Sequence, residues 1–268
     1  GKSVMSLSIL DLIESPGRVV GGEVLLNGRD LRKLSEKEMQ KVRGKEIAMI
    51  FQDPMASLNE RAKVDYIVSE GLTNIRHDLS REEIEERVAK ALLDVGLLPE
   101  FASRFPHEFS GGQRQRIGIA RALAVEPRFI IADEPISALD VSIRAQVLNL
   151  MSKLQKERGL TYLFIAHDLS VMRFICDRIA VIHKGVIVEL SETEKLFAHP
   201  LHPYTRALLS AIPMPDPESE REKVLEVYDP SCHHYETDKP VWTEIEPGHF
   251  IMANQEELAE YRKQLENN

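Results

Sequence analysis

Cysteine is almost absent from this sequence of 268 residues, which contains only Cys176 and Cys232. Two cysteines so far apart argue against a disulfide-stapled scaffold and against a metal site built on cysteine clusters, and they are typical of a reducing cytoplasm. Long hydrophobic runs are lacking too, because Lys2, Asp11 and Glu14 interrupt the apolar opening residues. We therefore expect neither a membrane span nor a secretory signal peptide.

The sequence also has no excess of basic residues. It contains 34 Lys and Arg residues and 43 Asp and Glu residues, which gives a net charge of −9. This balance argues against nucleic acid as a partner, with a local basic patch left open. The composition, 43% hydrophobic and 29% charged, allows one large domain with appendages or two small domains. Position 1 is Gly and not Met, so we expect the sequence to be a fragment.

Short apolar runs alternate with helical patterns along the chain, which predicts an α/β layered fold. Helical spacing is found at 2–14, 35–43, 64–98 and 255–265. The segments GEVLLNG and EIAMIF are predicted as short strands. Three later runs, FIIADEP, TYLFIAHD and RIAVIHKG, are typical of buried parallel strands. From Pro213 onward the composition shifts to a tail rich in Pro, Glu and Asp.

The residues that follow the apolar runs carry candidate chemistry, because ligands of an open α/β sheet bind outside the carboxyl ends of its strands. These positions hold Gln52, the pair Asp133 and Glu134, and His167. Carboxylates there hold a Mg²⁺-phosphate group or activate an attacking water, and a histidine at the next strand end contacts a γ-phosphate. Taken singly, each has an ordinary alternative as a loop glutamine, a helix start or a structural histidine.

Two further stretches point to phosphate binding. Gly1-Lys2-Ser3 matches the second half of the pattern G-x-x-x-x-G-K-[ST], in which loop amides cradle phosphates, the lysine reaches the β- and γ-phosphates and the hydroxyl ligates Mg²⁺. In FSGGQRQRIGIARAL, Ser110 is predicted as an N-cap, and Gly111 and Gly112 allow a close backbone approach ahead of Gln113. A helix start of this kind is predicted to be an anion site.

Together these motifs make the sequence similar to the ATP-binding subunits of ABC transporters. GKS resembles the end of the Walker A loop, MIFQDP the Q-loop and FSGGQ the signature, with Phe109 where Leu is commoner. FIIADEP resembles Walker B, SALD the D-loop and IAHD the switch histidine. Within the family, FQDPMASLN, DEPISALDVSIRAQVLNLM, HPLHPYTRALLSAIP and the tail YDPSCHHYETDKP resemble the oligopeptide and dipeptide importers. The part up to DPM resembles their D-type subunit and the remainder their F-type subunit.

The resemblance implies a P-loop NTPase fold with a RecA-like ABC ATPase core at 1–60 and 114–200. A helical subdomain at 61–113 would end in the signature, and 201–268 would form a C-terminal extension of the peptide-importer type. The implied function is an ATPase that powers import of oligopeptides or dipeptides, with ATP and Mg²⁺ as cofactors. The implied partners are a second ATP-binding subunit in a heterodimer, two membrane-spanning permease subunits and, indirectly, an extracytoplasmic peptide-binding protein. The chain would then sit at the cytoplasmic face of the cell membrane.

The resemblance also implies a role for each matching residue. Glu134 and His167 would be catalytic, because Glu134 would polarise the attacking water and His167 would contact the γ-phosphate. Ser3 and Gln52 would reach Mg²⁺, and Asp133 would hold it through water. The other implied nucleotide contacts, in this chain's site or in that of a partner subunit, are Gly1, Lys2, Ser110, Gly111, Gly112, Gln113 and Asp140.

Several alternatives stay open. One is a truncated or chimaeric remnant that keeps the fold and binds no nucleotide, and another is a soluble ABC ATPase of DNA repair or translation. Cys232-His233-His234 suggests a metal site, but the lack of further cysteines nearby argues against it. Because only the second half of the phosphate-loop motif is present, we expect these residues on their own to bind Mg-ATP weakly and to hydrolyse it poorly.

Overall fold

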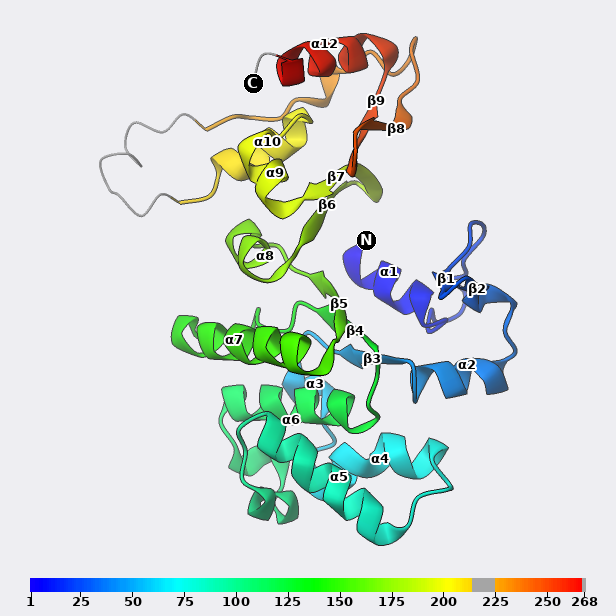
Figure 1. The fold of residues 1–268 in the computed structure, drawn as a ribbon, viewed down its shortest axis with the longest axis vertical. Coiled ribbons are helices and arrows are strands. Elements are labelled where there is room, and N and C mark those ends of the chain that lie inside the picture. Colours follow the sequence, from blue (N-terminus) through cyan, green and yellow to red (C-terminus); the bar gives the residue numbers. More distant parts are fainter. Residues whose placement is uncertain (214–224, 267–268) are drawn as a thin grey trace. The chain divides into compact units, whose positions relative to one another are not determined.

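The computed structural model describes residues 1–213 and 225–266 (Figure 1). The chain divides into two compact units, Lys2–Ala166 and His167–Asn268, and Gly1 is grouped with the second. Within the described ranges, no helix is long and apolar enough to cross a membrane.

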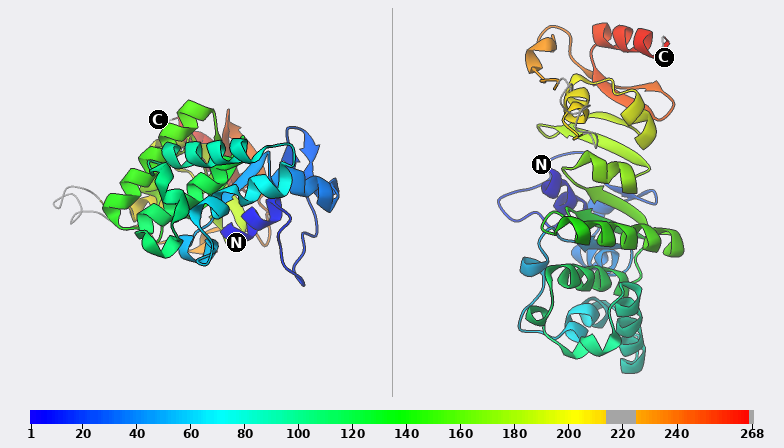
Figure 2. Two further views of the ribbon diagram at one scale, coloured as in Figure 1. Left: turned by 90° about the horizontal axis from the view of Figure 1, so that it is seen from below. Right: turned by 90° about the vertical axis from the view of Figure 1, so that its left-hand side faces the viewer.

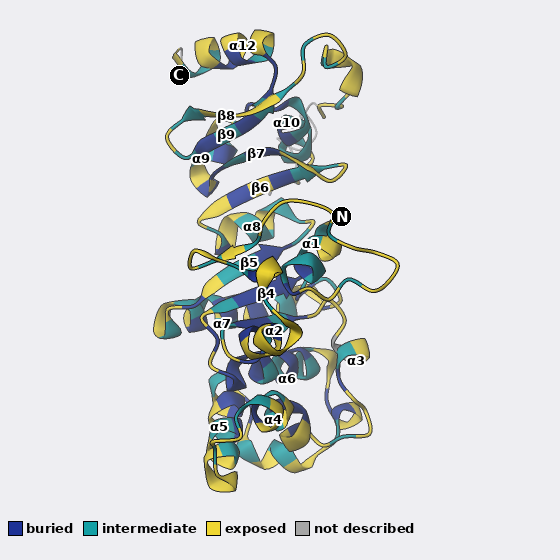
Figure 3. Ribbon diagram, turned by 90° about the vertical axis from the view of Figure 1, so that its right-hand side faces the viewer, coloured by how far each residue is buried: buried dark blue, intermediate teal, exposed yellow. Residues whose placement is uncertain are grey.

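A three-stranded parallel sheet forms the centre of the first unit (Figure 1). Its middle strand, β4 (Phe129–Asp133), pairs with β3 (Ile47–Ile50) on one side and with β5 (Thr161–Ile165) on the other. Ile130 and Ile131 of β4 have no exposed surface, as expected for a parallel strand covered on both faces. Figure 3 shows the same burial at the middle of this sheet. The structure confirms the strands predicted from EIAMIF, FIIADEP and TYLFIAHD.

Seven α-helices of the first unit surround this sheet or pack on one another. They are α1 (Lys2–Ile9), α2 (Glu36–Arg43), α3 (Pro54–Ser57), α4 (Val64–Ile75), α5 (Arg81–Asp94), α6 (Gly111–Ala124) and α7 (Val141–Arg158). A small hairpin of β1 (Leu25–Leu26) and β2 (Arg29–Asp30) and 3₁₀ turns at Leu31–Lys33, Pro99–Ser103 and Pro106–Glu108 complete it. Helix α1 contacts β4, and α6 contacts β3. Both helices are thereby fixed relative to the sheet.

Helices α4, α5 and α6 pack against one another (Figure 2, cyan to green). The continuous helical pattern at 64–98 is divided, because Ser80 starts a new helix with a capping box. Its Oγ accepts a hydrogen bond from Glu83 N at 3.2 Å, and the Glu83 carboxylate accepts one from Ser80 N at 2.7 Å. Helix α1 also ends before the predicted position 14, near Asp11, whose φ is 52°.

The second unit is built on a four-stranded antiparallel sheet in the order β6-β7-β9-β8. The strands are β6 (Arg178–His183), β7 (Val186–Glu192), β8 (Val241–Glu246) and β9 (His249–Ala253). Its described helices are α8 (Leu169–Ile175), α9 (Thr193–Ala198), α10 (Pro203–Ser210), a 3₁₀ turn at Pro230–Cys232 and α12 (Gln255–Glu266). The predicted charged helix at 255–265 is confirmed as α12.

The RIAVIHKG run is a strand, as predicted, but the expectation that it is parallel was wrong. Strand β6 pairs antiparallel with β7, because Lys184 and Gly185 form a tight turn with φ of 46° and 87°. Two successive positive φ angles give the turn whose twist suits a β-hairpin. Leu196 and Ile251 are fully buried in two core clusters of this unit.

Candidate active site

Both oxygens of the Glu134 carboxylate are engaged by residues predicted for the site. Lys2 Nζ at the start of α1 lies 3.1 Å from Glu134 Oε1. Gln52, two residues beyond the end of β3, donates a hydrogen bond from Nε2 to Glu134 Oε2 at 2.9 Å. Lys2 Nζ also donates to the carbonyl oxygen of Ala166 at 3.4 Å. The fold therefore brings two predicted residues, from different parts of the chain, to the carboxylate of a third.

The backbone of Glu134 is held in an unusual conformation directly after β4. Its φ is 46°, in the left-handed region that costs a residue other than glycine about 1 kcal/mol or more. Glu134 N donates to the carbonyl oxygen of Ile165 at 2.9 Å, which ties the residue to β5. Strain of this kind concentrates at functional sites, where the surrounding structure enforces it. The turn thus fixes the direction in which the carboxylate leaves the strand.

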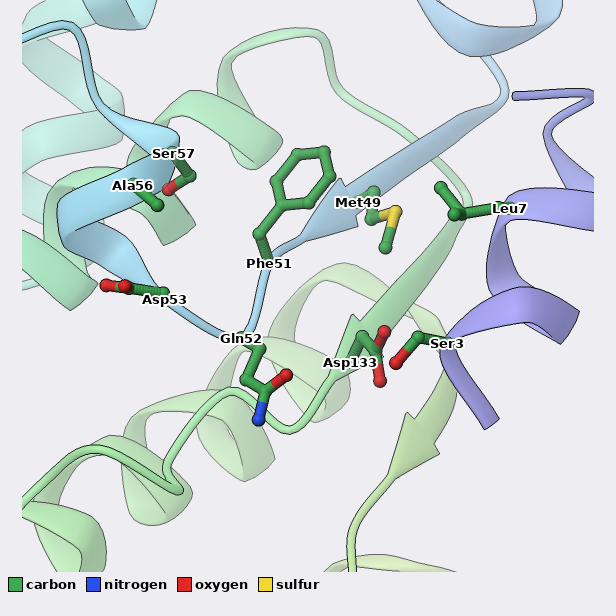
Figure 4. Close-up of a pocket in the computed structure, with 9 residues that line it drawn as sticks. All are labelled: Ser3, Leu7, Met49, Phe51, Gln52, Asp53, Ala56, Ser57 and Asp133. Carbon is green, nitrogen blue, oxygen red and sulfur yellow. The ribbon is translucent and has the colours of Figure 1, made fainter. Parts of the chain in front are cut away.

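Asp133, the last residue of β4, presents a buried carboxylate next to Ser3. The residue is only 4% exposed, and its Oδ1 has no hydrogen-bond partner among the described residues. Figure 4 shows the Asp133 carboxylate and the Ser3 hydroxyl pointing toward one another. A buried carboxylate oxygen without a partner beside a hydroxyl suits Mg²⁺, which uses one or two protein oxygens and completes its shell with water and phosphate. Ser3 and Asp133 therefore fit that ion.

A pocket of about 490 Å³ opens between α1, β3 and the short helix α3 (Figure 4). Ser3, Gln52 and Asp133 line it where β3 and β4 end, and its apolar wall includes Leu7 and Phe51. Sequence analysis missed the apolar wall. The spacing of Ser3 and Leu7, four residues apart on one helix face, is the signal that could have placed Leu7 in the same pocket.

The signature segment forms the start of α6, as predicted. Gln113 N donates to Ser110 Oγ at 3.4 Å, and Ser110 N donates to Gln113 Oε1 at 3.0 Å, so the N-cap is confirmed. The two glycines differ in their surroundings. A Cβ on Gly111 would have no neighbour within 4 Å, whereas a Cβ on Gly112 would lie 2.5 Å from Cγ2 of Ile143 on α7. Packing of α6 against α7 therefore explains Gly112, and Gly111 leaves the helix start open.

Asp140 is exposed at the N-cap position of α7. Its carbonyl oxygen accepts a hydrogen bond from Arg144 N at 2.8 Å. Asp140 and the Ser110 segment belong to the same unit as Lys2, Gln52, Asp133 and Glu134. The contacts described for the Glu134 carboxylate are with Lys2 and Gln52, and the assignment of Asp140 and the Ser110 segment to a nucleotide site stays a prediction.

His167 and Gly1 are both grouped with the second unit. His167 is exposed, and Asp168 next to it caps α8 by accepting a hydrogen bond from Ser170 N at 2.9 Å. The assignment of His167 and Gly1 to the site stays a prediction from the sequence.

In the Cys232-His233-His234 segment, the His233 side chain contacts residues of the second unit. His233 Nδ1 contacts the Glu257 carboxylate, and His233 Nε2 lies 3.0 Å from the hydroxyl of Tyr228. No group of three or more His, Cys, Asp or Glu residues suited to a metal occurs within 1–213 and 225–266. These contacts support a packing role for the segment.

Comparison with known sequences gives two family matches. The family described as "ABC transporter" matches residues 1–137, and the family described as "Oligopeptide/dipeptide transporter, C-terminal region" matches residues 188–237. The oligopeptide transport ATP-binding protein AmiF of Streptococcus pneumoniae is 61% identical over 265 residues, which is 99% of this chain and 85% of that protein. The oligopeptide transport ATP-binding protein OppF of Bacillus subtilis is 53% identical over 259 residues, covering 96% and 84%. Both relatives are F-type subunits by name and are matched over nearly the whole chain, so the D-type resemblance of the part up to DPM stays a prediction from the sequence.

Solved structures give the same fold. A dimeric, post-hydrolysis state of the ATP-binding cassette MJ0796 bound to ADP and Pi superposes with a TM-score of 0.63 at 32% identity, covering 72% of this chain and 81% of that chain. The cbiO1 protein of Clostridium perfringens, described as part of the ABC transporter complex cbiONQ, gives a TM-score of 0.64 at 30% identity, covering 74% and 75%. The α/β P-loop fold of ABC cassettes is therefore shown for this chain.

Proposed function

The chain belongs to the ABC transporter family as an ATP-binding subunit of an oligopeptide or dipeptide importer, and on this premise we propose that Glu134 polarises the water that attacks ATP. The observation that carries the proposal is the convergence of Lys2 and Gln52 on the Glu134 carboxylate. A carboxylate held at the end of a buried parallel strand, beside a lysine suited to phosphate, has the position that a general base for phosphoryl transfer to water needs.

The phosphates and Mg²⁺ are assigned to the residues around Glu134. Lys2 carries the positive charge that would offset the β- and γ-phosphates, and the main-chain N–H groups at the start of α1 would bind the same anion, to which Gly1 is assigned from its place in the GKS motif. Ser3 and Gln52 would supply oxygens for Mg²⁺, and Asp133 would hold the ion through water. Bound Mg²⁺ would neutralise charge that develops on the transferred phosphate. The buried Asp133 Oδ1 beside the Ser3 hydroxyl supports this assignment.

His167 is proposed as a further contact of the γ-phosphate. It lies two residues after the end of β5. Its imidazole would donate a hydrogen bond to a phosphate oxygen and so report whether ATP or ADP is bound. This role comes from the position of His167 in the sequence motif IAHD.

Hydrolysis is proposed to need a second ATP-binding subunit. The open start of α6, with Ser110, Gly111, Gly112 and Gln113, is an anion site that would complete the partner's ATP site, and the exposed Asp140 would bridge the two subunits. The dimeric state of the related MJ0796 cassette supports this arrangement. We propose a heterodimer bound to two membrane-spanning permease subunits at the cytoplasmic face of the membrane, fed by an extracytoplasmic peptide-binding protein and without nucleic acid.

The division of the chain follows from these roles. Residues 1–60 and 114–200 are proposed as the ATPase core, 61–113 as the helical subdomain and 201–268 as the peptide-importer extension. The packing of α4 and α5 on each other supports a helical subdomain, which contacts the proposed core through α6.

A Glu134→Gln variant tests the proposed function. In the assembled transporter the rate of phosphate release is expected to fall by about 10²–10⁴, the usual contribution of a positioned base, while ATP still binds. Glu157→Gln on α7 is the matched control, because the Glu157 side chain is 59% exposed and its ion pair among the described residues is with Lys153 on the same helix. Hydrolysis by Glu134→Gln at the rate of the control would refute the role of Glu134.

A further inference from the structure

Arg144 lies in the first turn of α7 and donates its side-chain hydrogen bonds backward, to the segment that precedes the helix. Arg144 Nε donates to the carbonyl oxygen of Leu139 at 2.7 Å, and Nη2 donates to that of Ser137 at 3.4 Å. Both acceptors are main-chain atoms. A cation in the first turn of a helix is disfavoured by the helix dipole, so these contacts outweigh an unfavourable location.

The segment held by Arg144 runs from Glu134 to Asp140. At its start, Ser137 donates to the carbonyl oxygen of Glu134 twice, from N at 3.2 Å and from Oγ at 3.0 Å. In the middle, Leu139 N donates to the carbonyl oxygen of Ile136 at 3.2 Å. At its end, Asp140 is exposed and begins α7. A continuous set of hydrogen bonds therefore joins the strained Glu134 turn, the Arg144 guanidinium and Asp140.

Buried side chains anchor the 134–140 segment, and the Arg144 guanidinium determines the path of the main chain between these anchors. Ile136 and Leu139 are 5% and 7% exposed, so their side chains fix the segment to the core at two points. The carbonyl groups of Ser137 and Leu139 are satisfied by a single planar group that offers donors in fixed directions. A lysine at the same position has a single ammonium on a flexible stem and cannot hold both carbonyl groups with the same geometry.

We propose that Arg144 is a positioning residue that holds the 134–140 turn, so that Glu134 keeps its alignment in this chain's site and Asp140 keeps its position toward the partner subunit. The inference rests on the proposed function of Glu134 and Asp140. Arg144 touches neither the substrate nor the reacting atoms and acts only through the backbone of this turn. Because small displacements of a reacting group reduce rates strongly, loss of the guanidinium is expected to lower kcat and to leave ATP binding in place.

The test compares ATP hydrolysis by the assembled transporter carrying Arg144→Ala, Arg144→Lys or Lys153→Ala. Arg144→Ala is expected to lower kcat by roughly ten- to a hundredfold with an unchanged KM for ATP, and Arg144→Lys is expected to fall between it and the wild type. Millimolar guanidinium ion should raise the rate of Arg144→Ala and of no other variant, a response that a merely structural loss would not give. Lys153→Ala is the control, since its side chain is 64% exposed on the same helix.

Glu134→Gln measured beside these variants separates the two proposals. If Glu134→Gln is inactive while Arg144→Ala turns over at the wild-type rate, the positioning role is wrong and the proposed function stands. If Glu134→Gln turns over normally, the proposed function itself fails. Should Arg144→Ala not fold, Arg144→Lys decides, because a folded lysine variant with wild-type kcat overturns the inference.

Discussion

Lys2 and Glu134 form an ion pair of 3.1 Å that joins the start of α1 to the turn after β4. Both groups are needed for the proposed chemistry, the ammonium for phosphate and the carboxylate for water. In the proposed mechanism a phosphate bound to Lys2 would compete with the Glu134 carboxylate for the same ammonium, so nucleotide binding would be linked to release of the carboxylate. Gln52 holds the second carboxylate oxygen and extends the linkage to the segment that follows β3.

The proposed composite site predicts a split phenotype for Ser110→Arg. A guanidinium side chain at the start of α6 removes the Ser110 cap and would fill the space that is proposed to hold the partner's γ-phosphate. Hydrolysis at the partner's site should cease, while this chain's own phosphate loop still binds nucleotide. Site-specific hydrolysis in a mutant heterodimer measures both effects.

Ser110→Asn controls for folding in the same experiment, because asparagine also accepts the cap hydrogen bond from Gln113 N. Its melting temperature should equal that of the wild type. Normal hydrolysis at the partner's site by Ser110→Arg would show that α6 does not contribute to it.

The two signature glycines are predicted to respond differently to alanine. Gly112→Ala places a Cβ 2.5 Å from Ile143 Cγ2 and should destabilise the protein by about 1–3 kcal/mol through overpacking. Gly111→Ala meets no atom within 4 Å and should be neutral or slightly stabilising. Urea unfolding of both variants gives the two free energies.

A second substitution identifies the cause of the Gly112 effect. Ile143→Ala removes the Cγ2 atom, so the double variant Gly112→Ala/Ile143→Ala should lose less stability than the two single changes added together. If the losses in unfolding free energy of the two single variants simply add, the destabilisation by Gly112→Ala does not come from the contact with Ile143.

The parts of the site that could be predicted are those that lie within one stretch of sequence. The length and apolar character of FIIADEP and EIAMIF predict buried strands, and the residues after such strands lie at the ligand edge of a parallel sheet. Asp133, Glu134 and Gln52 follow from that rule alone. The N-cap at Ser110 is equally local, because its hydrogen bonds reach only to Gln113.

The parts that could not be predicted depend on contacts between distant residues. Gly112 meets Ile143 only after α6 and α7 pack, and no local pattern shows that contact. The antiparallel direction of β6 depends on positive φ at Lys184, a residue type that rarely signals a hairpin turn. Strand β9 pairs with β7, although two α-helices, a 3₁₀ turn and β8 of the described chain lie between them in the sequence, so its place in the sheet is a tertiary property.

The last prediction concerns the pH dependence of stability, which His202 is expected to dominate in the second unit. The residue is 2% exposed, and its Nδ1 accepts a hydrogen bond from Tyr204 N at 3.1 Å at the start of α10, so it must be neutral. Burial, with a smaller effect of His233, lowers the pKa of His202 from 6.5 to about 4, against the opposing charges of Glu189 and Glu257. The unfolded chain therefore binds more protons than the folded chain between these two values.

The sign of the effect follows from that difference. Stability from His202 is complete above the unfolded pKa of 6.5 and is lost as the pH falls toward 4. Unfolding free energies in urea should drop by about 2 kcal/mol between about pH 8 and about pH 5 on account of this residue. His202→Asn keeps an acceptor for Tyr204 N and has no charge to gain, so its pH profile should be flatter by that amount. Parallel profiles for the two proteins would show that His202 does not carry the pH dependence.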